Sequence, residues 1–312
     1  MMDAARAPPS RDAAPRRLTL VERLNAYERL MRLDKPIGTL LLLWPTMSAL
    51  WLAAHGAPRR SLVLIFAVGT LVMRSAGCAM NDWADRDFDA HVARTAARPL
   101  AARIIAPWEA LAVAAVGAFI AFLLVLFTNR AAMLWSIPAL AIAIVYPFSK
   151  RFFAIPQAVL GVAFSFGIPM AYAAVQNRVP PLAWGLLVIN LFWVVAYDTE
   201  YAMVDRADDA KIGIRTSALT FGRADVAVTA VCYAVYLAGM VFIGRVHALG
   251  VIYYAGLAIA LLIAIYHVWV IRARDAAACF HAFLGNHWLG MSVFLGVALD
   301  YAVRTERWPR AW

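Results

Sequence analysis

Apolar runs close to the roughly 20 residues that an α-helix needs to cross a bilayer recur nine times along the chain. Short breaks that contain Arg, Lys, Pro or Gly separate them. With 63% apolar and 15% charged residues among 312, the composition suits a protein dissolved in lipid. We therefore predict an all-α integral membrane bundle of about nine transmembrane helices. The predicted spans cover residues 37–55, 61–80, 108–128, 131–148, 156–176, 182–201, 225–244, 248–271 and 288–303.

The remaining composition excludes several other classes of protein. A net charge of +10 could suggest nucleic acid, but no basic run interleaved with aromatic residues forms a nucleic-acid groove. We therefore expect no nucleic-acid partner, and we assign the basic loops to the anionic surface of the membrane. The three cysteines, Cys78, Cys232 and Cys279, form no CxxC pair, and the six histidines are scattered. This pattern indicates no disulfide framework, zinc site or haem motif.

Segment 1–17 is rich in Arg, Ala and Pro and lacks the apolar stretch and cleavage site of a signal peptide. We expect it to be a disordered cytoplasmic lead, followed by a single intramembrane domain over 18–312. Most of the 29 Lys and Arg residues fall on the side of the predicted spans that holds the N-terminus, including all three lysines. The positive-inside rule therefore predicts a multi-pass protein of the inner (cytoplasmic) membrane, with a cytoplasmic N-terminus.

Nine of the 19 acidic residues are concentrated in two short stretches, 81–89 and 198–209, each at the predicted cytoplasmic end of an apolar span. If the helices continue through them, the acidic positions recur with helical spacing and form one row on each helix. The first row comprises Asp82, Asp85 and Asp89, with Asn81 beside it; the second comprises Asp198, Tyr201, Asp205 and Asp209. Because both rows lie on one side of the membrane, we predict that they converge.

Stacked carboxylates repel one another, and placing them near hydrocarbon adds a desolvation cost, so a cation must offset them. Magnesium is the natural candidate because it takes oxygen ligands and commonly joins protein carboxylates to substrate phosphates. The lack of His and Cys in the clusters argues against zinc or copper. The simpler alternative is that these are solvated loop residues paired with nearby arginines, but two matched clusters make it the weaker one.

If the substrate is a diphosphate, basic groups should stand close to the carboxylates. The candidates on the same side of the membrane are Arg94, Arg98, Lys150, Lys211 and Arg215. Arg74 differs from these, because it lies within an apolar span, two turns before Asn81. A mid-span arginine is a functional candidate by default. We predict that Arg74 binds the carboxylate of an acidic acceptor; an interhelical ion pair or snorkelling is the alternative.

Three stretches resemble one protein family. They are 33–39 (LDKPIGT), 74–99, which runs from Arg74 through Asn81-Asp82 to Pro99, and 198–213 (DTEYAMVDRADDAKIG). The chain resembles the UbiA-type intramembrane prenyltransferases from residue 18 to the ninth predicted helix, and its paired acidic motifs are highly specific for that family. The resemblance makes 18–312 a single prenyltransferase domain with a central cavity, two magnesium ions and a side opening for a lipid tail.

The resemblance also implies roles for individual residues. The family motifs NDxxDxxxD and DxxYAxxDxxDD correspond to Asn81, Asp82, Asp85 and Asp89, and to Asp198, Tyr201, Asp205, Asp208 and Asp209. Of these, we expect Asp82, Asp85, Asp198 and Asp205 to serve catalysis, all but Tyr201 and Asp208 to ligate the metal, and Tyr201 to join Arg74 at the acceptor. Arg215 stands where related proteins often have Lys, which keeps the charge.

The implied activity is transfer of a polyprenyl group from polyprenyl diphosphate to the ring carbon ortho to the hydroxyl of 4-hydroxybenzoate, in ubiquinone biosynthesis. Departure of the diphosphate gives the allylic carbon cationic character, so the site must exclude water. The aromatic residues Phe164, Phe166, Trp193 and Tyr197 are candidates for lining the tail channel, although packing elsewhere is the simpler expectation for any one of them. Three alternatives stay open: the same chemistry on another quinone precursor, a membrane cation transporter, and a prenyl-binding scaffold. No protein partner is evident.

Overall fold

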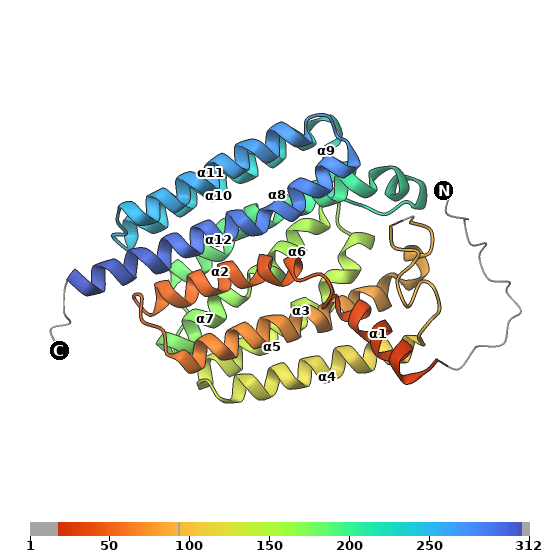
Figure 1. Cartoon of the computed structure of the whole chain (residues 1–312), viewed down its shortest axis with the longest axis horizontal. Helices are drawn as coiled ribbons and strands as arrows, with labels where there is room; N and C mark the ends of the chain where they lie inside the picture. The colour runs from red at the N-terminus through yellow and green to blue at the C-terminus, as the bar shows by residue number, and fades with distance from the viewer. Residues whose placement is uncertain (1–17, 93, 308–312) are drawn as a thin grey trace, which may run out of the picture.

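The computed structural model describes residues 18–92 and 94–307, and every regular element in them is a helix. Most helices run along a common axis, as Figure 1 shows. The elements are α1 (Leu20–Met31), α2 (Ile37–Ala53), α3 (Arg60–Asp89), α4 (Pro107–Leu126), α5 (Arg130–Val145), η1 (Tyr146–Arg151), α6 (Pro156–Ser165), α7 (Gly167–Gln176), α8 (Pro181–Ile212), α9 (Ser217–Phe221), η2 (Gly222–Ala224), α10 (Asp225–Val246), α11 (Val251–Ile271) and α12 (Ala276–Arg307). The predicted lead, 1–17, lies outside the described residues.

The described chain contains eight helical stretches long and apolar enough to cross a membrane, and α2 is a further, shorter apolar helix of 17 residues. Helices suit a bilayer because each satisfies its backbone hydrogen bonds within its own segment. In Figure 1, α1 lies at one end of the bundle and the last turns of α12 lie at the other, as an odd number of crossings requires. The predicted all-α membrane bundle of about nine helices is confirmed.

Helices α3 and α8 run farther than the apolar spans 61–80 and 182–201. Helix α3 has 30 residues and α8 has 32, so both acidic stretches belong to helix rather than to loop. Helix α8 ends at Ile212 and is capped by Gly213, whose φ of 70° lies in the left-handed region that favours glycine. The helical spacing predicted for the acidic residues is therefore present.

The predicted span 156–176 is divided into α6 and α7, which meet at Phe166. Pro169 lacks the backbone N–H that would bond to the carbonyl oxygen of Ser165, so the hydrogen-bond ladder is interrupted there. Gly167, at the start of α7, lies against Thr46 of α2; an added Cβ would be 2.4 Å from Thr46 Oγ1. The break therefore brings α2 and α7 into close contact.

Two helical segments, α1 and the first turns of α12, lie outside the spans predicted from the sequence. Helix α1 is too short to span a membrane, and it begins with a capping box in which Thr19 Oγ1 accepts from the backbone N–H of Glu22, 3.2 Å away. Helix α12 begins at Ala276, well before residue 288, where the predicted span starts. The prediction started late because the first turns of α12 include polar residues that interrupt the apolar pattern. One of these, Asn286, is fully buried.

A buried hydrogen-bond network fixes one face of α8. Glu200 is fully buried and accepts hydrogen bonds from Tyr233 Oη of α10 and Asn286 Nδ2 of α12, both at 2.8 Å. Trp193, two turns earlier on α8, donates its Nε1–H to Asn286 Oδ1 at 2.9 Å. These bonds hold α8 against α10 and α12, so the opposite face of α8, which carries Asp198, is turned toward α3.

Helices α11 and α12 approach closely because glycines face each other between them. A Cβ added to Gly256 would be 2.6 Å from the backbone oxygen of Ser292 and 3.0 Å from Cα of Gly296. Lipid tails are as apolar as the helices, so close van der Waals packing, rather than a hydrophobic driving force, stabilises such a contact.

We predict that Gly256→Leu lowers the thermal unfolding midpoint of the purified protein, because the new side chain must push α11 and α12 apart. Overpacking of this kind costs about 1–3 kcal/mol or more. The matched control is Gly185→Leu on α8, where an added Cβ meets nothing within 4 Å. Equal unfolding midpoints for the two variants would show that this contact contributes nothing to stability.

Candidate active site

A cavity of about 930 Å³ lies within the bundle and has two chemically different parts. Its polar end is lined by both acidic rows and by the loop that follows α3. The rest, which we call the apolar arm, is lined by residues such as Phe66, Gly69, Ala121, Val125, Ala132 and Met170. The cavity therefore joins a charged compartment to an apolar one, and it could hold a ligand with a charged head and an apolar tail.

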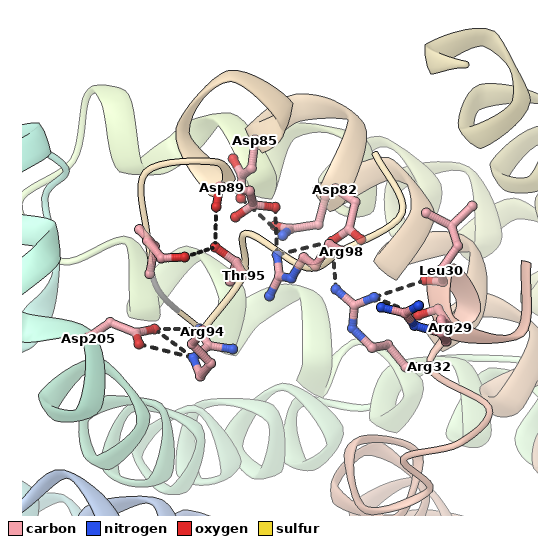
Figure 2. A network of polar contacts seen from close by, with 12 residues as sticks. Arg29, Leu30, Arg32, Asp82, Asp85, Asp89, Arg94, Thr95, Arg98 and Asp205 are labelled. Atoms are coloured by element: carbon pink, nitrogen blue, oxygen red, sulfur yellow. Dashed lines mark hydrogen bonds and ion pairs between the residues drawn. The ribbon is translucent and has the colours of Figure 1, made fainter. Parts of the chain in front are cut away.

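The two acidic rows converge on the polar end, as their spacing predicted. Asp82, Asp85 and Asp89 on α3 line the same cavity as Asp198, Asp205 and Asp209 on α8. Arg94 links the loop after α3 to α8, since its Nε lies 3.0 and 3.1 Å from the two carboxylate oxygens of Asp205 (Figure 2). Arg94 also lies over the ring of Tyr201, 4.5 Å from its centroid.

Cationic side chains neutralise the first row. Arg98 bridges Asp82 and Asp89 at 3.1 and 2.8 Å, and Arg32 donates to Asp82 at 2.7 Å (Figure 2). Burial on its own would lower the pKa of Arg98, but Asp82 and Asp89 outweigh it and hold that pKa above its usual range. Lys150 pairs with Asp85. Every carboxylate of the first row therefore has a basic partner.

The elements that carry these cations are tied to α3. Thr95 is buried and donates its hydroxyl to the backbone oxygen of Asp89 at 2.8 Å, which folds the loop after α3 back over the polar end. Arg151 donates to the backbone oxygen of Ala84 at 2.9 Å and so holds η1, with Lys150, beside the acidic row. Local backbone anchoring thus positions both Arg98 and Lys150.

Arg74 lines the cavity, and its Nε is buried without a hydrogen-bond partner in the described structure. Its guanidinium lies against Gly38 of α2, where an added Cβ would be 2.4 Å from Arg74 Nη2. Among the described residues, no acidic side chain forms an ion pair with it within 4.0 Å. A buried guanidinium with unused donors can bind an anionic group through its planar fork.

The donor set of the polar end suits a hard divalent cation. Oδ2 of Asp82 and Oδ1 of Asp85 are buried and have no hydrogen-bond partner in the described structure. Such oxygens are the ligands that magnesium prefers. No group of three or more His, Cys, Asp or Glu side chains in residues 18–92 and 94–307 is arranged to hold a metal alone. A metal here would share its ligands with a phosphate-bearing substrate, as magnesium commonly does.

Two of the predicted diphosphate ligands, Lys211 and Arg215, differ in their position relative to the cavity. Lys211 points away from the cavity; its side chain is 74% exposed and pairs with Asp208, one turn earlier, at 3.1 Å. Arg215 lines the cavity and donates to the backbone oxygen of Phe152 at 2.7 Å. Of the four aromatic candidates, Phe164, Phe166 and Tyr197 line the cavity, whereas the fully buried ring of Trp193 packs in the core, as was the simpler expectation for any one of them. The other predicted site residues, Asn81 and Tyr201 among them, all line the cavity.

Arg32 is the main site residue that the sequence analysis missed. It caps the C-terminal end of α1 in a left-handed conformation with φ 56°, and Arg29 of the same helix donates to the backbone oxygen of Ala97 at 2.6 Å. The capping-box pattern of Thr19 and Glu22 could have revealed α1, and with it Arg32 at the polar end.

This fold and cavity define a helical membrane protein for an amphiphilic, anionic ligand, and the family model described as the UbiA prenyltransferase family matches residues 42–290. The chain belongs to this family.

Relatives and solved structures agree with that assignment. The chain is 59% identical to a 4-hydroxybenzoate octaprenyltransferase of Azoarcus sp. over 92% of this chain and 100% of the relative. It is 61% identical to one from Burkholderia vietnamiensis over 91% and 98%. A UbiA homolog from Aeropyrum pernix superposes with a TM-score of 0.73 at 25% identity, over 86% of this chain and 98% of that one. A homolog from Archaeoglobus fulgidus bound to GPP and Mg2+ has a TM-score of 0.67 at 16% identity, covering 89% and 99%.

We predict that Arg98→Met destabilises the protein, because it removes a partner from two carboxylates, of which Asp82 is 1% exposed. Breaking a buried ion pair costs roughly 3–5 kcal/mol, and Arg32 should keep the loss near the lower figure. Thermal unfolding in detergent measures it. Lys211→Met is the control, since that side chain is exposed; a midpoint as high for Arg98→Met as for the control would contradict the prediction.

Proposed function

We propose that this protein transfers a polyprenyl group from polyprenyl diphosphate to the ring carbon ortho to the hydroxyl of 4-hydroxybenzoate, in ubiquinone biosynthesis. The observation that carries the proposal is the cavity, whose charged end and apolar arm match the two halves of such a donor. Relatives about 60% identical over nine-tenths of the chain bear the name of this activity and support the choice of acceptor.

The diphosphate binds at the polar end. Arg94, Arg98 and Lys150 are within reach there, and they exchange some of their carboxylate contacts for phosphate oxygens when the donor enters. Magnesium is held by Asn81, Asp82, Asp85 and Asp89 of α3 and by Asp198, Asp205 and Asp209 of α8, together with the diphosphate. When bound, the metal offsets negative charge on the departing diphosphate.

Arg74 binds the acceptor. Its guanidinium offers unused donors to the carboxylate of 4-hydroxybenzoate, and Gly38 leaves the space that this side chain occupies. Tyr201, between Arg94 and Phe283, supplies an aromatic surface on α8 beside the acceptor, with ring centroids 4.6 Å apart for Tyr201 and Phe283.

The reaction breaks the allylic carbon–oxygen bond, forms a carbon–carbon bond to the ring and releases a ring proton. The guanidinium and ammonium groups of Arg94, Arg98 and Lys150 stabilise the charge that collects on the leaving diphosphate. The apolar arm excludes water from the cationic allylic carbon, which would otherwise become an alcohol. Because Tyr146 and Tyr197 line the cavity near Arg74, their rings can shield that carbon.

We place the protein in the inner membrane with the acidic end cytoplasmic, as the distribution of Lys and Arg suggests. A cation transporter would need carboxylates near the midplane and access from both faces. Asp82, Asp85 and Asp89 lie instead within about the last two turns of α3. Asp205 and Asp209 lie within about the last two turns of α8, and both helix ends are at one end of the bundle, which favours the transferase.

We predict that membranes containing the protein convert radiolabelled 4-hydroxybenzoate and a polyprenyl diphosphate to a lipid-extractable product only when Mg2+ is present. Asp82→Asn should lower kcat about 100-fold or more, as the loss of one charge-stabilising contact does. The control is Asp87→Asn, five residues later on α3, since the Asp87 side chain is 77% exposed. Full activity of Asp82→Asn, or activity unaffected by a chelator, would refute the metal site, and labelling of another aromatic acceptor instead would change the substrate.

We predict that Arg74→Met raises KM for 4-hydroxybenzoate at least about tenfold, because a hydrogen bond to a charged group contributes about 1.5–3 kcal/mol. KM for the donor should stay within about twofold. With 4-hydroxybenzamide, which lacks the carboxylate, wild type and variant should have similar KM values. An increase confined to the donor KM would place Arg74 at the diphosphate instead.

A further inference from the structure

Gly69 of α3 lines the apolar arm and leaves open space in it. A Cβ built at Gly69 meets no heavy atom within 4 Å, whereas one at Gly117 or Gly161, elsewhere in the bundle, would lie 2.9 or 3.0 Å from a neighbouring side chain. Gly69 is therefore not required for helix packing. The consequence of the missing side chain is additional room in the arm.

The position of Gly69 along α3 determines which part of a bound ligand lies beside it. Asp85 marks the polar end on the same helix, and at about 1.5 Å per residue Gly69 lies about 24 Å farther along the axis. A donor whose head is at Asp85 and whose tail has only one or two isoprene units cannot extend that far. A long polyprenyl tail that follows the apolar arm reaches Gly69.

Because the arm is apolar, it distinguishes between hydrocarbon tails by their size and shape. Its lining is mainly aliphatic and aromatic, with Phe66 one turn from Gly69 on α3 and Ala121 and Val125 contributed by α4. Such a surface offers few hydrogen bonds to a hydrocarbon tail, so affinity follows the apolar area buried and the space available. Filling this space would shorten the tail that fits.

We propose that Gly69 is a specificity-determining position for donor tail length: without a side chain there, the arm stays open beyond this level of α3 and accepts long polyprenyl tails. The inference rests on the proposed function and adds to it the residue whose missing side chain lets a long tail pass.

The test compares Gly69→Ala and Gly69→Leu with wild type in the full-length protein, reconstituted in lipid. Geranyl and octaprenyl diphosphate serve as donors, and both binding and transfer to 4-hydroxybenzoate are measured. Gly69→Leu should lower kcat/KM and affinity for the octaprenyl donor at least tenfold and leave the geranyl donor within twofold, with Gly69→Ala intermediate. The control Gly185→Leu places the same side chain on α8, outside the cavity, and should match wild type.

The outcomes separate this inference from the proposed function. An unchanged octaprenyl-to-geranyl ratio in Gly69→Leu, or an equal loss with both donors, overturns the role of Gly69. Absence of transfer by wild type with either donor would refute the proposed reaction, and the binding ratio would still decide the role of Gly69. The thermal unfolding midpoint identifies a misfolded Leu variant, in which case Gly69→Ala decides the question by the same ratio.

Discussion

The balance of charge at the polar end is the constraint on which the rest of the structure depends. Asp82 and Asp85 are almost completely buried, and a carboxylate in such surroundings is tolerated only beside a cation. The cations come from α1, from the loop after α3 and from η1, so three otherwise separate segments are drawn to one place. The polar end is thus assembled by ion pairing, together with an apolar cluster in which Leu30 of α1 packs against Leu100 and Ile105 of the loop after α3.

Contacts between helices in the membrane part of the bundle orient α8 toward the polar end of the cavity. One face is fixed by Glu200 and Trp193, which bond to α10 and α12, and the other presents Asp198 and Asp205 to the cavity. In lipid, polar contacts and close packing between helices take over the role that the hydrophobic effect has in water. A network that never meets the cavity therefore sets the rotation of the helix that supplies half of the acidic residues.

The charged end and the apolar arm together determine which kind of ligand the cavity can bind. A substrate with a diphosphate head and a hydrocarbon tail can satisfy both parts at once, whereas a purely polar or purely apolar ligand would leave one part unmatched. In the proposed reaction, the same arrangement keeps water from the reacting carbon. Under our proposal for Gly69, the shape of the arm then selects among donors.

The sequence by itself determined the membrane bundle and the two acidic rows, because span length and the helical repeat are local properties of the chain. It predicted the convergence of Asp85 and Asp205 from their common side, and the structure brings them to one cavity. Only tertiary structure decided that Arg32 reaches Asp82, that Lys211 points outward, and where the apolar arm runs. These features depend on contacts between segments far apart in sequence, where neither hydropathy nor periodicity carries information.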